Sequence, residues 1–405
     1  MKKLAARGIF VLAALALILS ACGGNTGTGG GSDSPQMTQD SFKSSVTEYA
    51  AATTTVAMET ASDNLALIAM QDLMGKEPSS VASSSNGLVK LAALSKNGSA
   101  SLAEVSSAVR ELIPLAAGES LPRGVYNYSE GEDEDGEPVP AWTKASDSDD
   151  LVFNWSFTNF TDGTDHTASL TFDWNFGGET VFVLDLPDAR IEVPTSAKMT
   201  LKVDRSPVAW TTGAFGWYSG SCGAIFEPTS VAIAGQFGTS DYVKFDFGLT
   251  VTSSSVATSG SFETKSGTDT ASFEWNYVGN GSVTRGDDCF ISGINITDGS
   301  VGFKSKVVSG GETNSLDFGT KFALNIAEDA LGSDDMPIES ITLSNGYLKL
   351  NGETAFTFEG VLDDMDSETP GQHVIIHFAD GDTTLADLLS SGSAPTYGSL
   401  LPGSF

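Results

Sequence analysis

Few residues in this chain of 405 could hold a metal ion or activate a nucleophile, because it has only three histidines and three cysteines. His373 and His377 are four positions apart, and on a helix this spacing would bring both rings to one zinc ion. Val374, Ile376 and Phe378 alternate with the residues between them, which predicts a strand. Positions four apart on a strand are about 13 Å from each other, so we expect both histidines on an exposed face and no metal site.

Motifs of the common enzyme classes are incomplete or absent. The segment 216–220 has the serine of a nucleophile elbow, but its leading glycine is displaced by one position, and no phosphate-binding loop occurs. His166 lies just after the Asp162-Gly163 turn, which favours a loop. Asp173 and Glu274 each precede a tryptophan in two similar segments and could form the carboxylate pair of a glycosidase, although solvated strand faces explain them more simply. We therefore predict no catalytic residue and no cofactor, and keep a polysaccharide hydrolase as an alternative.

Three aromatic residues are candidates for binding a ligand by stacking. Trp142, Trp217 and Tyr218 fall in segments that we expect to be exposed loops. Exposed aromatic rings can stack on sugar rings, so these residues would suit a carbohydrate ligand.

Cys222 and Cys289 are the cysteines of the central region, and both lie in polar surroundings. Disulfides persist in exported proteins, and the N-terminal segment described below resembles an export signal, so we expect a bridge between these cysteines. The bridge would close the long loop between Cys222 and Cys289, and the chain-entropy model gives such a closure a stabilisation of about 4 kcal/mol. Two free thiols or a metal pair are the alternatives.

An acidic run occupies residues 129–150. Its oxygen ligands would suit calcium. An EF-hand loop, however, needs an acid five positions before its glycine, and Gly131 stands at that position before Gly136. Trp142 occupies the position of the final glutamate. We therefore expect an acidic linker over residues 119–150, with weak divalent binding as the alternative.

The N-terminus begins with basic residues and continues into an apolar stretch that ends in Leu19-Ser20-Ala21-Cys22. This segment resembles the lipobox of a bacterial lipoprotein signal peptide. The resemblance implies removal of residues 1–21 and acylation of Cys22 by fatty acids such as palmitate, so that the chain is anchored to a membrane of the cell envelope. Gly23 stands where an aspartate would favour inner-membrane retention, so the outer membrane is expected in a diderm organism. An ordinary secretory signal with a chance cysteine is the alternative.

Two segments separate this signal from the acidic run. Residues 22–38 are rich in glycine and serine and predict a flexible tether. Residues 39–118 are rich in alanine, leucine and methionine without strict alternation, which favours helices. One helix should contain Leu67, Met70 and Met74, and a second should begin with the capping box at Ser101 and Glu104.

From residue 151 the hydrophobic pattern changes to a period of two, as in Phe153, Trp155 and Phe157. We therefore predict a mainly β protein, with about 14 to 18 antiparallel strands over residues 151–380. The sheet would form a sandwich or a curled half-barrel, with a C-terminal tail over residues 381–405. The expected turns are Asp162-Gly163, Asn280-Gly281, Asp298-Gly299, Asn345-Gly346, Asn351-Gly352 and Asp380-Gly381.

A formal net charge of −31 makes nucleic acid an unexpected partner, because its phosphates would be repelled. We expect a lipid-anchored envelope protein of binding or structural type. Its ligand would be a lipid, a glycan or another envelope protein. The alternatives are a lipid or lipoprotein carrier that uses the apolar face of a curled sheet, and a protein that binds or hydrolyses polysaccharide.

Overall fold

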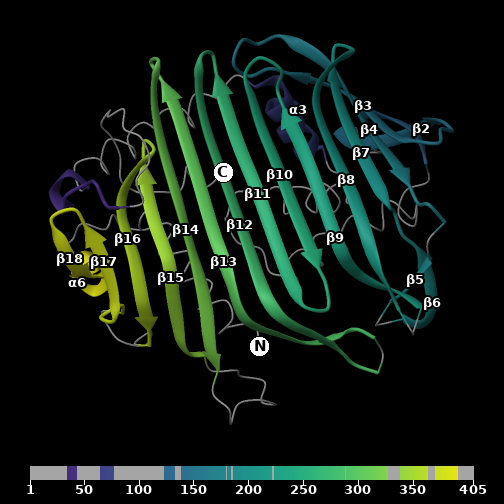
Figure 1. Cartoon of the computed structure of the whole chain (residues 1–405). Helices are drawn as coiled ribbons and strands as arrows, with labels where there is room; N and C mark the ends of the chain where they lie inside the picture. The colour runs from purple at the N-terminus through teal and green to yellow at the C-terminus, as the bar shows by residue number, and fades with distance from the viewer. Residues whose placement is uncertain are drawn as a thin grey trace.

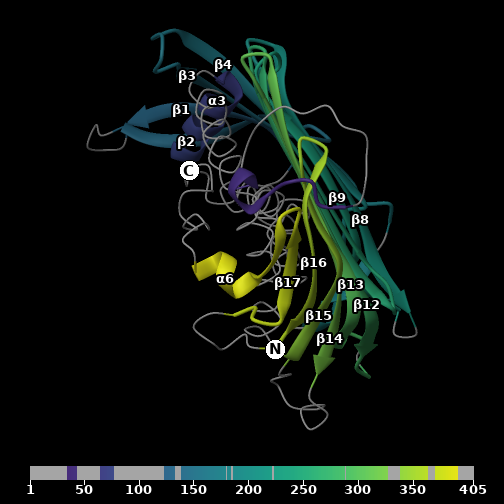
Figure 2. The ribbon, with the colours of Figure 1, turned by 60° about the vertical axis from the view of Figure 1, so that its left-hand side comes forward.

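A computed structural model describes residues 34–42, 64–76, 123–132, 138–178, 180–183, 186–220, 223–287, 289–326, 338–363 and 370–390. Within these ranges the chain forms one large open sheet with short helices on one side (Figures 1 and 2). The helices are α3 (Leu65–Gly75) and α6 (Leu385–Ser390). The strands are β1 (Gly124–Glu132), β2 (Pro138–Ser146), β3 (Leu151–Thr158), β4 (Asp165–Asn175), β5 (Thr180–Val183), β6 (Leu186–Glu192), β7 (Ser196–Val203), β8 (Ser206–Gly220), β9 (Gly223–Phe237), β10 (Tyr242–Val251), β11 (Ser255–Ser266), β12 (Asp269–Arg285), β13 (Ile291–Ser309), β14 (Glu312–Ile326), β15 (Ile338–Leu350), β16 (Glu353–Leu362), β17 (Val374–Phe378) and β18 (Gly381–Thr384).

The main sheet has 16 strands in the order β2-β1-β3-β4-β7, followed by β8 to β18 in sequence. Only β1 and β3 are parallel, and the other neighbours in this order are antiparallel. The β5–β6 hairpin joins the end of β9 through a single parallel bridge from Phe182 to Ile225. The edge strands β2 and β18 do not pair with each other, so the sheet does not close.

The prediction of a large antiparallel sheet is confirmed, and one of the two architectures left open is excluded. The pairing is continuous from β2 to β18, so the described strands do not split into the two sheets of a sandwich. Both ends of the sheet bend toward the side that carries α3 and α6 (Figure 2). The sheet is therefore open and curved, as in the half-barrel alternative.

Strict alternation of burial divides the sheet into an apolar and a polar face. Along β3, Leu151, Phe153 and Trp155 are buried, while Asn154 and Ser156 point to the other face. The helices cover the apolar face. Ala66, Ile68, Ala69 and Leu73 of α3 pack against the apolar side chains of β3, β4 and β7, and Leu385 and Leu388 of α6 belong to the larger apolar cluster of β8 to β17.

The predicted helix around Leu67 is confirmed, and its start has a clear cause. The side chain of Asn64 accepts hydrogen bonds from the backbone N–H groups of Ala66 and Leu67, which caps α3. The predicted helix at Ser101 lies outside the described residues.

The N-terminal segment also packs on the apolar face. The Gln36 N–H donates to the Thr354 carbonyl, and the Ala379 N–H donates to the Met37 carbonyl. The Phe42 ring meets the Phe356 ring edge-on at 5.2 Å. The flexible tether was expected to extend to residue 38, and this boundary is wrong because Gln36 and Met37 already bind the sheet.

Two other segment boundaries need correction. Residues 119–150 were expected to be an acidic linker, but residues 124–132 and 138–146 are the antiparallel strands β1 and β2. The expected tail after residue 380 begins with β18 and α6, and only its last 15 residues lie outside the described chain.

Three of the six expected turns are turns, namely those at Gly163, Asn351 and Asp380. Asn280-Gly281 and Asn345-Gly346 lie within long strands at shifts of register, and Gly299 lies within β13. The expected turns in β12 and β13 do not form because these strands are long, with 17 and 19 residues, and accommodate an irregular residue as a bulge.

Glycines in the sheet make room for aromatic rings on the opposite strand. Gly260 faces Trp275, and a Cβ at Gly260 would lie 2.5 Å from the indole Nε1. Gly235 faces Phe245 in the same way. Such pairing lets a large ring cover exposed backbone in the sheet.

Candidate functional site

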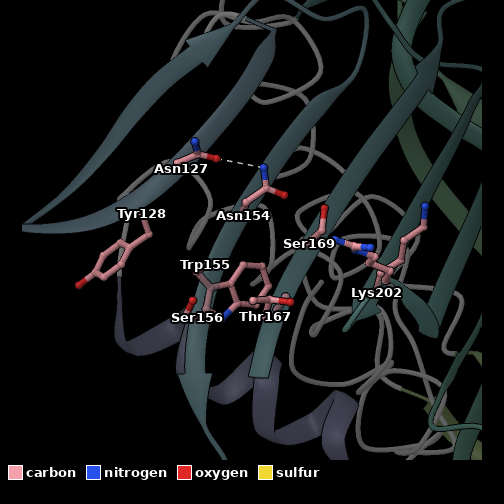
Figure 3. Close-up of a pocket in the computed structure, with 10 residues that line it drawn as sticks. Asn127, Tyr128, Asn154, Trp155, Ser156, Thr167, Ser169 and Lys202 are labelled. Carbon is pink, nitrogen blue, oxygen red and sulfur yellow. Dashed lines mark hydrogen bonds between the residues drawn. The ribbon is translucent and has the colours of Figure 1, made fainter. Parts of the chain in front are cut away.

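A hollow of about 520 Å³ lies over β1, β3, β4 and β7, near one end of the sheet (Figure 3). Its lining residues are Asn127, Tyr128, Asn154, Trp155, Ser156, Thr167, Ala168, Ser169, Lys202 and Arg205. The helices lie on the other side of the sheet, so the hollow is formed by the polar face alone.

The pairing of the strands places four polar residues of the hollow in one row. Asn127 is opposite Asn154, Asn154 is opposite Ser169, and Ser169 is opposite Lys202. Figure 3 shows these side chains from β1 to β7 in this order. Neighbouring strands are about 4.8 Å apart, so the row is about 14 Å long. Ser156 and Thr167 form a second pair beside it.

Tyr128 and Trp155 border the hollow through their backbone, because alternation directs their side chains to the apolar face. Trp155 is 3% exposed and belongs to the apolar cluster with Phe153. Tyr128 packs edge-on against Trp142, with ring centroids 5.3 Å apart. The side chains that face a ligand are therefore amides, hydroxyls and two cations.

A hydrogen bond orders the amides. Nδ2 of Asn154 donates to Oδ1 of Asn127 at 3.1 Å. This bond uses one of the two N–H groups of Asn154 and leaves its carbonyl oxygen free to accept, while Asn127 keeps both N–H groups as donors. The pair can thus offer both donors and an acceptor to a ligand.

Lys202 and Arg205 supply the positive charge of the hollow. Both side chains are exposed, and neither forms an ion pair or hydrogen bond within the described part of the chain. Each is therefore available to an external anion or hydroxyl group. Arg205 adds a planar fork of donors that matches a carboxylate or a phosphate.

The two-residue turn between β7 and β8 holds Arg205 at the rim of the hollow. Asp204 and Arg205 have φ values of 48° and 71°, which is the left-handed pair of a type I′ hairpin turn. Asp204 ties this turn to β4. Its carboxylate contacts Nδ1 of His166 at 2.8 Å and accepts a hydrogen bond from the Thr167 N–H at 3.0 Å.

The His166 hydrogen bond, followed by that of the Thr167 N–H, holds the pKa of Asp204 below its ordinary value. The other ring nitrogen of His166 lies 2.9 Å from the Thr164 hydroxyl, and that hydroxyl donates to Asp162. His166 was expected in a loop, but it lies in β4 and joins two turns. Its partners are the carboxylate of Asp204 and the hydroxyl of Thr164, so the arrangement stiffens the rim of the hollow.

The aromatic residues proposed from sequence do not form one site. Trp142 and Trp217 lie in strands β2 and β8, so their expected place in exposed loops is wrong. Trp142 packs on Phe153, and its indole donates to the Lys76 carbonyl at 3.2 Å. Trp217 is 8% exposed and donates to the Pro194 carbonyl at 3.0 Å. Both indoles therefore fill the apolar face.

Tyr218 also lies in β8, and its ring is covered by another side chain of this protein. The Arg285 guanidinium lies 3.5 Å from the centroid of the Tyr218 ring. Arg285 also contacts the buried carboxylate of Glu227 at 2.7 Å and donates to the Cys289 carbonyl at 2.8 Å. The Glu227 carboxylate in turn accepts from the Ile291 N–H at 2.9 Å. This network joins the β8–β9 hairpin to the β12–β13 connection and takes the Tyr218 face out of reach of a sugar.

Cys222 and Cys22 lie outside the described residues. The predicted bridge from Cys222 to Cys289 and the acylation of Cys22 therefore remain predictions. Cys289 is buried, and it lies in the β12–β13 connection, which the Glu227–Arg285 pair fastens to the β8–β9 hairpin.

The suggested glycosidase pair is wrong on distance. Asp173 lies on β4 and Glu274 on β12, which are separated by six strand steps and so by roughly 25–30 Å. The two carboxylates of a glycosidase must lie within about 10 Å. Each of these acids is instead registered opposite a lysine, Lys198 and Lys304 respectively.

One histidine of the pair is placed as predicted. His377 lies in β17, on the polar face, and contacts Asp382 at 2.9 Å. His373 is exposed, but it lies in the turn before β17, where it contacts Asp363 at 2.8 Å. Among the described residues, no group of three histidine, cysteine or acidic side chains could hold a metal ion.

One cleft on the apolar face is very small. This cleft lies among Phe172, Trp174, Met199 and Phe215 and has a volume of about 20 Å³. A single water needs about that much space, so an acyl chain would not fit there. None of the helices in the described ranges is both long and apolar enough to cross a membrane.

The residues of the hollow were not predicted from the sequence. Asn127 fell in the expected acidic linker, and neither Asn154 nor Lys202 was a candidate site residue. Their common signal is polar residues on one face of several strands, which becomes a site only once the strands are paired. No family model, curated protein or solved structure matches this chain, so its function has to be argued from this geometry.

Proposed function

We propose that this chain is a lipid-anchored binding protein of the cell envelope and that the hollow on β1, β3, β4 and β7 holds a polar ligand. The observation that carries the proposal is the row from Asn127 to Lys202, where amides, a hydroxyl and a cation face solvent side by side. Groups of this kind recognise hydroxylated or anionic molecules, because they can donate and accept at fixed spacing.

The lipid anchor is the second part of the proposal and rests on the sequence Leu19-Ser20-Ala21-Cys22. Within the described ranges, Gln36 is the first residue that hydrogen-bonds the sheet, and it lies 14 positions after Cys22. An extended chain of this length reaches at most about 50 Å. The anchor would thus hold the sheet near the membrane while the glycine-rich tether lets it turn.

The other functions considered from the sequence receive less support. A lipid carrier needs an apolar cavity, and the cleft at Trp174 is too small for an acyl chain. A hydrolase needs a pair of carboxylates close together, and Asp173 and Glu274 are not such a pair. The polar hollow is the feature that favours binding without turnover.

Two experiments test the proposal. First, membrane fractions of the natural host should contain the wild-type protein with the mass of an acylated Cys22, whereas Cys22→Ala should appear in the soluble fraction. Retention of Cys22→Ala in the membrane would contradict the anchor.

Second, the purified protein without residues 1–21 should be retained by at least one member of a panel of immobilised neutral and acidic polysaccharides. The double variant Asn154→Ala/Lys202→Ala should lose this retention. Lys306→Ala is the matched control, because Lys306 is an exposed lysine on the same face of the sheet, six strand steps away on β13. Equal retention of all three proteins would show that the hollow is not the binding site, and retention by no member of the panel would contradict the binding function.

A further inference from the structure

We infer that the ligand of the hollow is an acidic glycan that crosses the strands, and that Trp210 extends the hollow as its stacking platform. This inference rests on the proposed function and specifies its ligand. Three features carry it, namely the direction of the polar row, the two cations and the exposed indole.

The first feature is the direction and length of the row. The side chains of Asn127, Asn154, Ser169 and Lys202 follow one another perpendicular to the strands. A sugar unit in an extended glycan has nearly the length of one strand spacing, about 4.8 Å. Successive sugar units can therefore meet successive strands, each with one polar side chain.

The second feature is the exposed indole of Trp210, which the sequence analysis did not consider. Trp210 is 37% exposed and is one of two large hydrophobic side chains in the described chain with such exposure. Its neighbours Ala209 and Thr211 are both buried, so alternation directs the indole to the polar face.

Trp210 continues the row beyond Lys202. It lies on β8 opposite Thr200 of β7, and Thr200 is two residues from Lys202 on the same face. Residues in such diagonal positions are about 7–8 Å apart, within reach of one extended ligand. With β8 included, the surface spans about 19 Å and would hold about four sugar units.

An exposed indole beside amides and hydroxyls has the chemistry of a sugar site. The apolar face of a pyranose ring packs on an aromatic ring, while its hydroxyls bind the polar groups around it. A nucleic acid would also offer flat rings, but a phosphate backbone binds through many cations, and the lining of the hollow has only two, Lys202 and Arg205.

The third feature is the pair of cations, which favours an acidic glycan over a neutral one. Lys202 and Arg205 have no ion pair within the described chain, and the nearest carboxylate on the turn, that of Asp204, already binds His166 and Thr167. The net negative charge opposes an acidic ligand at long range. Salt limits such repulsion to about 8 Å at physiological ionic strength, whereas the contacts with Lys202 and Arg205 are direct.

The experiment compares a tetramer of galacturonic acid with its carboxyl-reduced form, the galactose tetramer, by calorimetric titration of the protein without residues 1–21. We expect the acidic tetramer to bind at least about tenfold more tightly, because charge-assisted hydrogen bonds are the stronger kind. Lys202→Ala and Arg205→Ala should each weaken the acidic tetramer about tenfold and change the affinity for the neutral tetramer much less.

Trp210 has its own readout. Trp210→Ala should weaken both tetramers about equally, because stacking does not depend on the carboxylate, and Trp210→Phe should restore most of the loss. Binding should also quench the fluorescence of the wild-type protein to a greater extent than that of Trp210→Phe. Lys306→Ala again serves as the control for a general change in charge.

The outcomes separate the inference from the proposed function. Equal affinity for both tetramers would overturn the acidic glycan and leave a polar binding protein. Unchanged binding in Trp210→Ala would remove the stacking platform. If neither tetramer binds while a neutral polysaccharide of the panel is retained through Asn154 and Lys202, this inference fails and the proposed function stands.

Discussion

Nδ1 of His166 lies 2.8 Å from Oδ2 of Asp204, and this contact joins strand β4 to the turn that presents Arg205. The same carboxylate accepts hydrogen bonds from the N–H and the hydroxyl of Thr167. Side-chain hydrogen bonds therefore hold one rim of the hollow in place. The turn at this rim consists of Asp204 and Arg205 and contains no glycine.

The Asp204 contact predicts a pH dependence of stability. The pKa of Asp204 is lowered in the folded protein, so its ionised form stabilises the fold above the ordinary carboxyl pKa of about 3.9. This stabilisation is lost as the pH falls through the lowered pKa. Asp204→Asn should lower the midpoint of unfolding in guanidinium chloride at pH 7. The difference in midpoint between this variant and the wild-type protein should shrink below about pH 4.

Glu312→Gln is the control for the Asp204 prediction, since the Glu312 carboxylate is exposed and has no hydrogen bond within the described chain. It should leave the midpoint nearly unchanged at both pH values. A pH-independent deficit in Asp204→Asn would assign the effect to altered hydrogen-bond geometry at this position and not to the ionised carboxylate.

The buried pair of Glu227 and Arg285 should matter more than the surface pairs. Arg285→Gln leaves the Glu227 carboxylate buried without its cation, at 10% side-chain exposure. We expect a loss of about 2–4 kcal/mol in the free energy of unfolding. Lys304→Gln should cost less than about 1 kcal/mol, because Lys304 is 64% exposed and lies 3.9 Å from Asp317. Equal losses in denaturant titrations would contradict the central role of this network.

The pairing of Gly260 with Trp275 predicts a specific sensitivity to a methyl group. Gly260→Ala would place its Cβ 2.5 Å from the indole, so the ring must shift, at a cost of about 1–3 kcal/mol. In Gly248→Ala the new Cβ meets only the hydroxyl of Ser259, which can rotate, so the loss should be smaller. Thermal unfolding measures both losses, and equal losses would show that the ring adapts freely.

The contact of Phe42 with Phe356 should fix the N-terminal segment on the sheet. Phe42 is 2% exposed, and Phe42→Ala should cost about 3–5 kcal/mol if the segment unfolds together with the sheet. Amide exchange at Gln36 and Ala379 should quicken, because their hydrogen bonds join this segment to β16 and the end of β17. Phe160→Ala is the control at 71% exposure and should change stability by less than about 0.5 kcal/mol.

The predicted disulfide can be tested separately. Alkylation of the denatured but unreduced mature protein should modify neither Cys222 nor Cys289, and both should react after reduction. Cys289→Ser should lower the free energy of unfolding by about 2–4 kcal/mol. The double variant with Cys222→Ser should lose no more than the single variant, and a larger loss would contradict the pairing.

The sequence alone predicted the mainly β class, the approximate number of strands and the helix around Leu67. These properties depend on local patterns, because alternation with a period of two allows a strand one apolar face, and a helix needs its apolar residues three or four apart. The position of His377 on the polar face followed from the same rule, since Val374, Ile376 and Phe378 alternate with it in β17.

Only the tertiary structure decided which residues share a site. Asn127 and Lys202 are 75 positions apart in sequence but become members of one row because β1, β3, β4 and β7 pair in that register. Trp142 and Trp217 were expected in exposed loops, and strand pairing turns both toward the apolar face. Period-two alternation determines that a strand has two faces, whereas long-range pairing determines which side chains meet on each face, and that information is not local.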